Sequence, residues 1–267
     1  MTENRIAIIY EGEKSEKHLF DNIQRCFFEK DAEVIPVCLP AAGNIYMLWS
    51  QLSEDDSQTD VIPILKRQSE KAKEILGDYK QSDFSEIYLF FDYDIHANNL
   101  GNKALSHEEV LKSMLELFSN ETENGKLYIN YPMIESIRDI ETEEVCYRHC
   151  SIDSSESARY KSKVGELIRE NPESMRYCQF SKYTPADWGY FCRNAIKKAN
   201  CICNDCFELL DRKTILKELT QFNIFKMHQQ KFALSGRIAV LSSVPLFLVE
   251  YFKKEFWRET TYVNDKG

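Results

Sequence analysis

The stretch Ile6-Ala7-Ile8-Ile9-Tyr10 is a short apolar run, and the acidic turn Glu11-Gly12-Glu13-Lys14-Ser15-Glu16 follows it directly. A second run of the same kind, Ile87-Tyr88-Leu89-Phe90-Phe91, is followed by Asp92-Tyr93-Asp94. Short runs rich in β-branched and aromatic residues, bounded by polar turn residues, are typical of buried strands. Each acidic group is therefore predicted to lie at the end of a strand.

Patterns typical of helices and strands alternate through the rest of the first half of the chain. Polar residues at Asp55-Asp56-Ser57 interrupt a long helical pattern, which Pro63 would restart. The predicted helices cover residues 15–28, 45–77 and 108–118, and the further strands cover residues 33–39 and 127–131. We therefore expect an α/β fold in which helices flank a sheet.

The second half of the chain is predicted to be mainly helical, with helices over residues 164–170, 188–199, 206–222 and 238–256. The stretch Ser151–Ser157 is polar, Ser-rich and without periodicity, which is typical of a linker. We therefore expect two domains, residues 1–150 with the sheet and residues 151–267 as a helical extension. The apolar stretch Leu241–Val249, extended by Phe252, Phe256 and Trp257, fits either burial against the sheet or docking to a partner or second copy.

Three carboxylates are predicted to share one crevice. In an open α/β sheet, ligands bind beyond the carboxyl ends of the strands, so Glu11 and the Asp92-Asp94 pair can converge there. The i, i+2 spacing of Asp92 and Asp94 puts both side chains on one face of an extended segment. Three carboxylates repel one another unless a cation lies between them, and Mg²⁺ and Mn²⁺ prefer oxygen ligands. A tight turn at Glu11-Gly12 and a solvated strand end or helix N-cap at Asp92 are the alternatives.

A Glu-Gly turn after a first strand and an Asp-x-Asp after a later strand resemble the signature of the Toprim domain, the metal-binding fold of topoisomerases, primases and nucleases. The string Tyr10–Glu16 is most similar to small Toprim proteins of bacterial anti-phage systems: the RloB-like and OLD-like nucleases and the Toprim effector of the PARIS system. The resemblance covers roughly residues 5–140. It implies a Toprim-like sheet and a metal-dependent nuclease, with Glu11, Asp92 and Asp94 as catalytic metal ligands.

The resemblance also implies further site residues. Pro132 is expected to open a helix with Glu135 in its first turn, and Glu135 looks like the additional acidic residue that such nucleases carry after the Asp-x-Asp strand. An acid favoured by the helix dipole is the alternative. Glu16 would join Glu135 in a second metal site. Lys182 looks like the lysine that OLD-like nucleases place near the scissile phosphate.

The net charge of -9 opposes a free-standing nucleic-acid binder and favours a subunit of a complex. The chain has no P-loop, so an ATPase would be a separate protein. The resemblance implies a DNA or tRNA substrate, an ABC-type ATPase sensor and a homodimer as partners. Three basic stretches are candidate phosphate contacts, although solvated helix faces carry similar charges: Arg159, Lys161 and Lys163; Arg193, Lys197 and Lys198; and Arg212, Lys213 and Lys217.

The composition indicates the compartment in which the protein works and the state of its cysteines. No apolar run approaches the ~18 residues of a membrane span, and no signal-peptide pattern opens the chain. We therefore expect a cytoplasmic protein without membrane partners. The nine cysteines are an odd number, which favours reduced thiols, and the alternative is a zinc site formed by Cys203, Cys206, Cys146 and Cys150.

Two other functional classes remain open on the sequence alone. A Toprim scaffold can act as a non-catalytic interaction subunit of a larger assembly, which the acidic charge and the missing ATPase motif also suit. A nucleotidyl or phosphoryl transferase would use the same carboxylates, but it needs a nucleotide-binding feature that the sequence does not contain. Metal-dependent cleavage by the purified chain distinguishes these classes.

Overall fold

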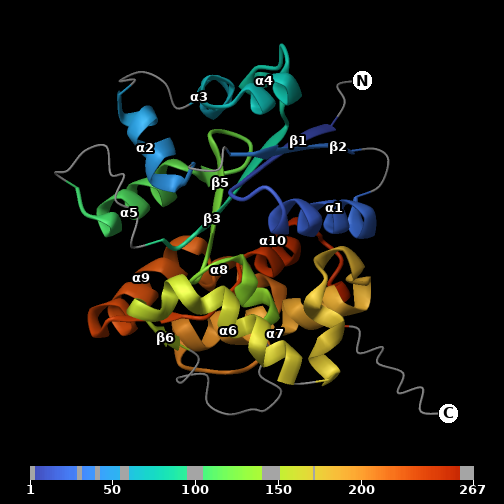
Figure 1. Ribbon diagram of the computed structural model, residues 1–267, viewed down its shortest axis with the longest axis vertical. Coiled ribbons are helices and arrows are strands. Elements are labelled where there is room, and N and C mark those ends of the chain that lie inside the picture. The colour runs from blue at the N-terminus through green and yellow to red at the C-terminus, as the bar shows by residue number, and fades with distance from the viewer. Residues whose placement is uncertain are drawn as a thin grey trace. The chain divides into compact units, whose positions relative to one another are not determined.

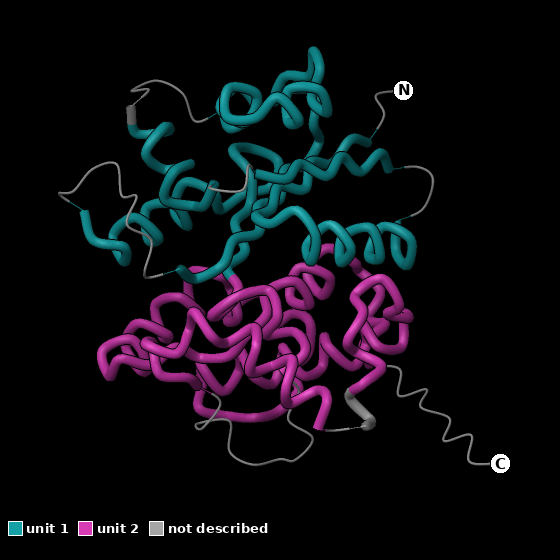
Figure 2. The backbone as a smooth tube through the Cα atoms, in the orientation of Figure 1, with its two compact units in different colours: residues 1–129 teal, residues 130–267 magenta. Residues whose placement is uncertain are grey.

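The computed structural model describes residues 4–28, 32–39, 43–54, 60–94, 105–139, 151–170 and 172–258. The chain packs into two compact units, residues 1–129 and residues 130–267 (Figure 2). The division falls upstream of the expected linker. The sequence-based assignment of domains to residues 1–150 and 151–267 stays a prediction. Among the described residues, no helix has the length and apolar character needed to cross a bilayer.

The N-terminal unit is built on a five-stranded sheet with the strand order β2-β1-β3-β5-β4. The central strand β1 (Asn4–Tyr10) pairs in parallel with β2 (Ala32–Cys38) on one side and with β3 (Glu86–Asp92) on the other. At the other edge, β4 (Ser119–Asn120) pairs antiparallel with β5 (Gly125–Asn130). The predicted α/β fold is confirmed, and in this sheet the two-residue strand β4 was not predicted.

Two crossover connections place β1 beside β3. The first contains α1 (Ser15–Phe27), and the second contains α2 (Ile45–Glu54), α3 (Val61–Gln68) and α4 (Glu70–Leu76). Because such connections are right-handed and lead to opposite sides of β1, they cover opposite faces of the sheet. Figure 1 shows α1 on one side of the strands and α3 and α4 on the other. The helix α5 (His107–Leu117) follows β3, with a capping box at its start.

Aromatic rings hold α1 against the sheet. Phe20 of α1 lies 5.1 Å from the ring of Tyr10 and 4.7 Å from the ring of Phe90, measured between centroids. The ring of Phe90 in turn stacks on Tyr128 of β5 at 5.2 Å. All four side chains are buried. This continuous stack joins β1, β3 and β5 immediately before the positions where β1 and β3 end.

The C-terminal unit is mainly helical, as predicted. Its α-helices are α6 (Tyr160–Glu170), α7 (Pro185–Asn204), α8 (Arg212–Glu218), α9 (Gln221–Lys231) and α10 (Val244–Tyr251). Short 3₁₀ helices connect them: η2 (Ile134–Arg138), η4 (Ser154–Arg159), η5 (Pro172–Cys178), η6 (Phe180–Lys182), η7 (Ala233–Ser235) and η8 (Phe256–Arg258). The strands β6 (Ser151–Asp153) and β7 (Arg237–Ala239) form an antiparallel pair.

The predicted linker Ser151–Ser157 is wrong, because this stretch forms β6 and the first part of η4. Its polar side chains make local hydrogen bonds that stabilise ordered structure. The Asp153 carboxylate accepts from the backbone N–H and hydroxyl of Ser155, at 2.9 and 2.5 Å. Arg237 of the partner strand donates to the hydroxyl oxygen of Ser151 at 2.7 Å.

Two predicted helices are shorter than expected. The helical pattern over residues 206–222 divides into α8 and the start of α9, because Asp211 and Thr220 act as N-caps at the two starts. The pattern over residues 238–256 becomes helical only at Val244, since Ile238 lies in β7 opposite Ile152. Apolar runs alone do not distinguish a buried strand from a buried helix.

The apolar segment Leu241–Val249 is core, so the docking alternative does not hold for it. All nine of its residues are buried, and Trp257 has no exposed surface. The segment packs on α7: the Cys192 thiol donates to the Pro245 carbonyl at 3.4 Å, and Arg193 donates to the Trp257 carbonyl at 2.6 Å. Burial of this segment is thus confirmed, with α7 as a packing partner, whereas its expected burial against the sheet stays a prediction.

Candidate functional site

The carboxyl ends of β1 and β3 lie side by side. The two strands are in parallel register from Ile6 beside Glu86 to Tyr10 beside Phe90. Glu11 therefore follows the last paired residue of β1, and Asp92 is the last residue of β3. The crossovers leave β1 and β3 in opposite directions, which makes this the topological switch point where open α/β sheets bind ligands.

The segment from Asp92 to Asp94 is a tight turn instead of an extended strand end. The backbone N–H of Asp94 donates to the carbonyl of Asp92 at 2.9 Å, which closes a three-residue turn. The argument from i, i+2 spacing on an extended segment is therefore wrong here. The charges of Asp92 and Asp94 nevertheless act on Glu11, because each raises the pKa of the Glu11 carboxyl.

Glu11 is an acid of the site whose surroundings disfavour its charged form. Its Oε1 atom is buried and has no hydrogen-bond partner among the described residues. Burial raises the pKa of Glu11 well above its ordinary value, and the charges of Asp92, Asp94 and Glu16 raise it further. A backbone hydrogen bond from Asp92 opposes this shift. Glu11 is thus a half-buried acid with one buried oxygen and like charges acting on it.

Gly12 brings Glu16 to the same turn. Gly12 has a φ of +82°, which favours glycine, and a Cβ atom at this position would lie 2.4 Å from Oε2 of Glu16. The Glu16 carboxylate, in the first turn of α1, therefore lies directly over the Gly12 backbone. The turn after β1 thus contributes two half-buried carboxylates, and one oxygen of Glu11 is buried.

The donor set suits a hard divalent cation. All four side chains offer carboxylate oxygens, which Mg²⁺ and Mn²⁺ prefer, and one of these oxygens is buried without a partner. Within the described parts of the chain, no three His, Cys, Asp or Glu side chains lie close enough together to hold a metal ion. Metal binding at this turn would therefore require the carboxylates to move closer together.

Tyr46 is a neighbour of this group that the sequence analysis did not single out. It is the second residue of α2, and it has no exposed surface. Burial raises the pKa of Tyr46, and the charges of Tyr93, Asp94 and Glu11 raise it further. No local signal marks it, because a tyrosine at a buried helix position is ordinary in a sequence.

Two predicted site residues belong to the C-terminal unit. Glu135 lies in the first turn of η2 and is 2% exposed, but Pro132 does not open this helix, which begins at Ile134 after the N-cap Met133. Its Oε1 atom lies 2.6 Å from the ammonium group of Lys161, which forms an ion pair with it. Lys182 ends η6 with an exposed side chain. The assignment of Glu135 to a second metal site and of Lys182 to catalysis stays a prediction.

Several candidate phosphate contacts have structural partners within the C-terminal unit. Lys198 is 3% exposed and donates to the Asp139 carbonyl at 2.6 Å. Arg193 and Arg212 donate to main-chain carbonyls of Trp257 and Glu250. These three residues therefore act mainly in packing. Lys161 and Lys163 are exposed but form ion pairs with Glu135 and Glu156, whereas the side chains of Arg159, Lys213 and Lys217 are exposed and accessible to an anion.

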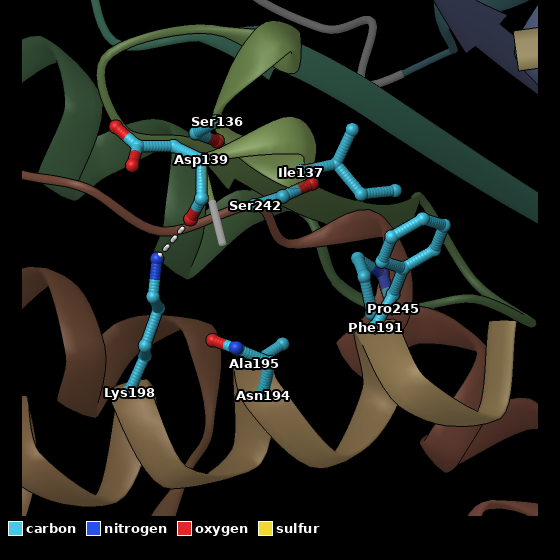
Figure 3. Close-up of a pocket in the computed structure, with 9 residues that line it drawn as sticks. All are labelled: Ser136, Ile137, Asp139, Phe191, Asn194, Ala195, Lys198, Ser242 and Pro245. Atoms are coloured by element: carbon cyan, nitrogen blue, oxygen red, sulfur yellow. Dashed lines mark hydrogen bonds between the residues drawn. The ribbon is translucent and has the colours of Figure 1, made fainter. Parts of the chain in front are cut away.

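A small cavity lies beside Lys198 (Figure 3). Its volume is about 10 Å³, which is room for about one water molecule. Residues of η2, of α7 and of the start of α10 line it: Ser136, Ile137, Asp139, Phe191, Asn194, Ala195, Lys198, Ser242 and Pro245. It is too small for a nucleotide, so it does not compete with the carboxylate turn as a substrate site.

The described cysteines are free thiols, as expected: Cys26, Cys38, Cys178, Cys192, Cys201, Cys203 and Cys206. Cys203 lies in α7 and Cys206 follows its left-handed cap residue, Asp205. Their suggested zinc partners, Cys146 and Cys150, lie outside the described residues. His96, close to the acidic turn in sequence, also lies outside them.

No protein-family model, curated protein or solved structure matches this chain. The likeness to Toprim proteins therefore rests on the motifs around Glu11 and Asp92 and on their positions at the ends of two adjacent parallel strands.

Glu11→Gln is expected to stabilise the metal-free protein. The folded-state pKa of Glu11 lies above its ordinary value of 4.5, so the folded protein binds more protons than the unfolded chain between the two values. The stability that Glu11 contributes is therefore greatest below pH 4.5 and is lost as the pH rises toward the raised pKa. Gln keeps the shape and an acceptor oxygen but has no charge.

Thermal unfolding in EDTA from pH 5 to 8 measures this effect. The Tm of Glu11→Gln should exceed that of the unchanged protein by an amount that grows with pH. Glu13→Gln is the matched control, because Glu13 lies in the same turn with an exposed side chain. A Glu11→Gln protein that melts lower at every pH would show that the carboxylate stabilises the apo fold.

Proposed function

We propose that this chain is a divalent-metal-dependent nuclease of the Toprim type. Glu11, Asp92 and Asp94 would hold the metal, with Glu16 beside them. The observation that supports this proposal is the meeting of carboxylates from two parallel strands at the switch point of the sheet, around a buried Glu11 oxygen without a partner. Like charges around a buried oxygen without a partner destabilise the metal-free protein. A bound cation would offset this cost, which gives a physical reason for the arrangement.

The residues of the chain would act by position and charge. A bound divalent ion would polarise the phosphodiester and neutralise its developing charge. Glu11 and Asp92 would orient the ion at the sheet edge, since the register of β1 and β3 holds their backbones side by side. Lys182 remains the proposed cation that offsets charge on the phosphate, and Glu135 the proposed ligand of a second ion.

The proposed biological role is that of a toxic effector in anti-phage defence, held by an ABC-type ATPase sensor. The net charge of -9 and the absence of a P-loop in the sequence support work within a complex, with ATP hydrolysis on another chain. DNA or tRNA is the proposed substrate, and a homodimer the proposed assembly. The exposed lysines of α6 are the candidate phosphate contacts.

A non-catalytic Toprim interaction subunit is the second candidate. One observation favours it: as they lie, no three metal-ligating side chains of the described residues are close enough to hold an ion. In that case the acidic turn would be a remnant or a protein-binding surface. Metal titration separates the two candidates directly.

The purified chain is expected to bind Mn²⁺ through shared ligands. In isothermal titration, Glu11→Ala and Asp92→Ala should each weaken Mn²⁺ binding, and the double variant should lose little more than either single variant. Cleavage of tRNA, single-stranded DNA and duplex DNA is measured in parallel with Mg²⁺, Mn²⁺ and EDTA. Binding and cleavage that disappear in EDTA support the nuclease.

Two results would contradict this prediction in different ways. Fully additive losses in the double variant would show that Glu11 and Asp92 belong to separate sites. No Mn²⁺ binding and no cleavage by the unchanged protein would leave the interaction subunit as the better function.

A further inference from the structure

Two arginine side chains join separate segments of the C-terminal unit. Arg212 of α8 donates to the Glu250 carbonyl at 2.8 Å, and Arg258 of η8 donates to the Leu210 carbonyl at 3.2 Å. The start of α8 therefore lies beside the end of α10 and beside η8. The exposed side of residues 210–217 and 250–258 is called the α8–η8 surface below.

Both segments contribute exposed lysines to this surface. Lys213 and Lys217 belong to α8, and Lys253 follows the end of α10. Ile215 is buried, and because residues two apart point to different sides of a helix, Lys213 and Lys217 share the outer face of α8. Among the described residues, no ion pair engages any of these three lysines. Their charges are therefore available to an anion.

Acidic side chains of the same segments have other partners. Asp211 caps the start of α8, and Glu255 forms an ion pair with Arg258. The Glu218 carboxylate accepts from the side-chain amide of Asn204 at 3.2 Å. The three lysines thus form a locally basic surface on a protein with a net charge of -9, and such a surface concentrates an anionic partner.

Aromatic rings alternate with these basic residues. Tyr251, Phe252 and Phe256 flank Lys253, and all three rings are half-buried, so each keeps some surface exposed to solvent. The ring centroids of Tyr251 and Phe252 are 4.8 Å apart, and those of Phe252 and Phe256 are 6.4 Å apart. The three rings therefore lie in a row beside the lysines. Proteins that bind single-stranded nucleic acid combine basic groups for the phosphates with aromatic rings for the bases.

We propose that the α8–η8 surface binds single-stranded nucleic acid, with Lys213, Lys217 and Lys253 on the phosphates and Phe252 stacked on a base. Base faces are open in a single strand, whereas a duplex presents only its grooves and phosphates to a protein. The role rests on the proposed nuclease function, because a nuclease must hold its substrate, but the binding itself needs no metal ion.

The test is the binding of fluorescein-labelled single-stranded RNA and DNA to the full-length protein, measured by fluorescence anisotropy in EDTA. The variant combines Lys213→Gln, Lys217→Gln and Lys253→Gln. We expect weaker binding, and a slope of log affinity against log salt concentration that is reduced by about 2, because each phosphate contact to a single strand contributes about 0.7. The Tm should not change, since exposed lysines outside ion pairs contribute little to stability.

The matched control removes the same number of exposed lysines from helices and turns of the N-terminal unit. It combines Lys73→Gln, Lys80→Gln and Lys112→Gln, so the net charge of the protein changes by the same amount. Its affinity and its salt slope should equal those of the unchanged protein. A general effect of net charge would instead weaken both variants equally, which would overturn the proposal.

Phe252→Leu tests the stacking contact separately. Leucine keeps an apolar side chain but has no ring. Single-strand affinity should fall about five-fold or more, the lower end for loss of one stacked base, while duplex DNA binding stays unchanged. If Phe252→Leu does not fold, Tyr251→Leu replaces it, because Tyr251 lies in the same row of rings.

Three results would overturn the proposed surface. The first is equal oligonucleotide affinity of the triple lysine variant and the unchanged protein, or no binding by either. The second is equal binding of duplex and single strands that the loss of the ring does not affect. The third is binding to phosphatidylserine vesicles that the lysine variant loses while it keeps its oligonucleotide affinity, which would indicate a membrane contact.

The nuclease function fails by a different result. Oligonucleotide binding that persists in EDTA, together with no cleavage in Mg²⁺ or Mn²⁺, would refute the nuclease and leave the α8–η8 surface in place. Cleavage by the triple lysine variant at the unchanged rate and with unchanged affinity would refute the surface and leave the nuclease in place.

Discussion

Asp92→Asn is expected to reduce metal-dependent cleavage by the purified chain at least about a hundred-fold, the scale seen when one group that stabilises transition-state charge is lost. Asp92 ends β3 beside Glu11, so its carboxylate is a central ligand of the proposed site. Asn is nearly the same size, and removing one charge relieves repulsion on Glu11. The fold should therefore survive, with an unchanged or higher Tm in EDTA.

Glu86→Gln is the control for this activity measurement. Glu86 begins the same strand, and its carboxylate accepts from Tyr88, so the substitution neutralises one acid at the opposite end of β3. Its cleavage rate with Mg²⁺ should match that of the unchanged protein. Equal rates for Asp92→Asn and the unchanged protein, at matched purity, would remove Asp92 from the site.

Trp257→Asp is expected to lower the free energy of unfolding by more than about 4 kcal/mol. Loss of a large buried aromatic side chain alone costs about 3–5 kcal/mol, and a buried, unpaired carboxylate adds to this. Trp257 has no exposed surface, and its backbone lies against Gly189 of α7. A Cβ atom at position 189 would lie 3.7 Å from the Cα atom of Trp257. Urea unfolding followed by circular dichroism measures the change.

Leu234→Asp is the matched apolar-to-acid control, because Leu234 in η7 is 86% exposed. It should unfold at the same urea concentration as the unchanged protein. If Trp257→Asp instead keeps its stability and shifts the mass measured by light scattering, the segment would be a docking surface and its burial in the C-terminal unit would have to be reconsidered.

Much of the N-terminal fold could be predicted from the sequence, because its signals are local. The apolar runs before Glu11 and Asp92 are buried strands, and the spacing of Leu19, Phe20 and Ile23 gives the buried face of α1. The turn at Gly12 also follows from local chemistry, since only glycine adopts its φ easily. The polar stretch Ser151–Ser157 misled the prediction, because its serines hydrogen-bond with Asp153 and Arg237 and form ordered structure.

Residue types and short spacings in the sequence by themselves determined that acidic groups end two strands, that the first half is α/β and that the second half is helical. Only the tertiary structure decided that β1 and β3 are adjacent and that Glu135 pairs with Lys161. The reason is physical. Strand and helix preferences act between neighbours in sequence, whereas the partner of a buried charge or hydroxyl depends on how distant elements pack.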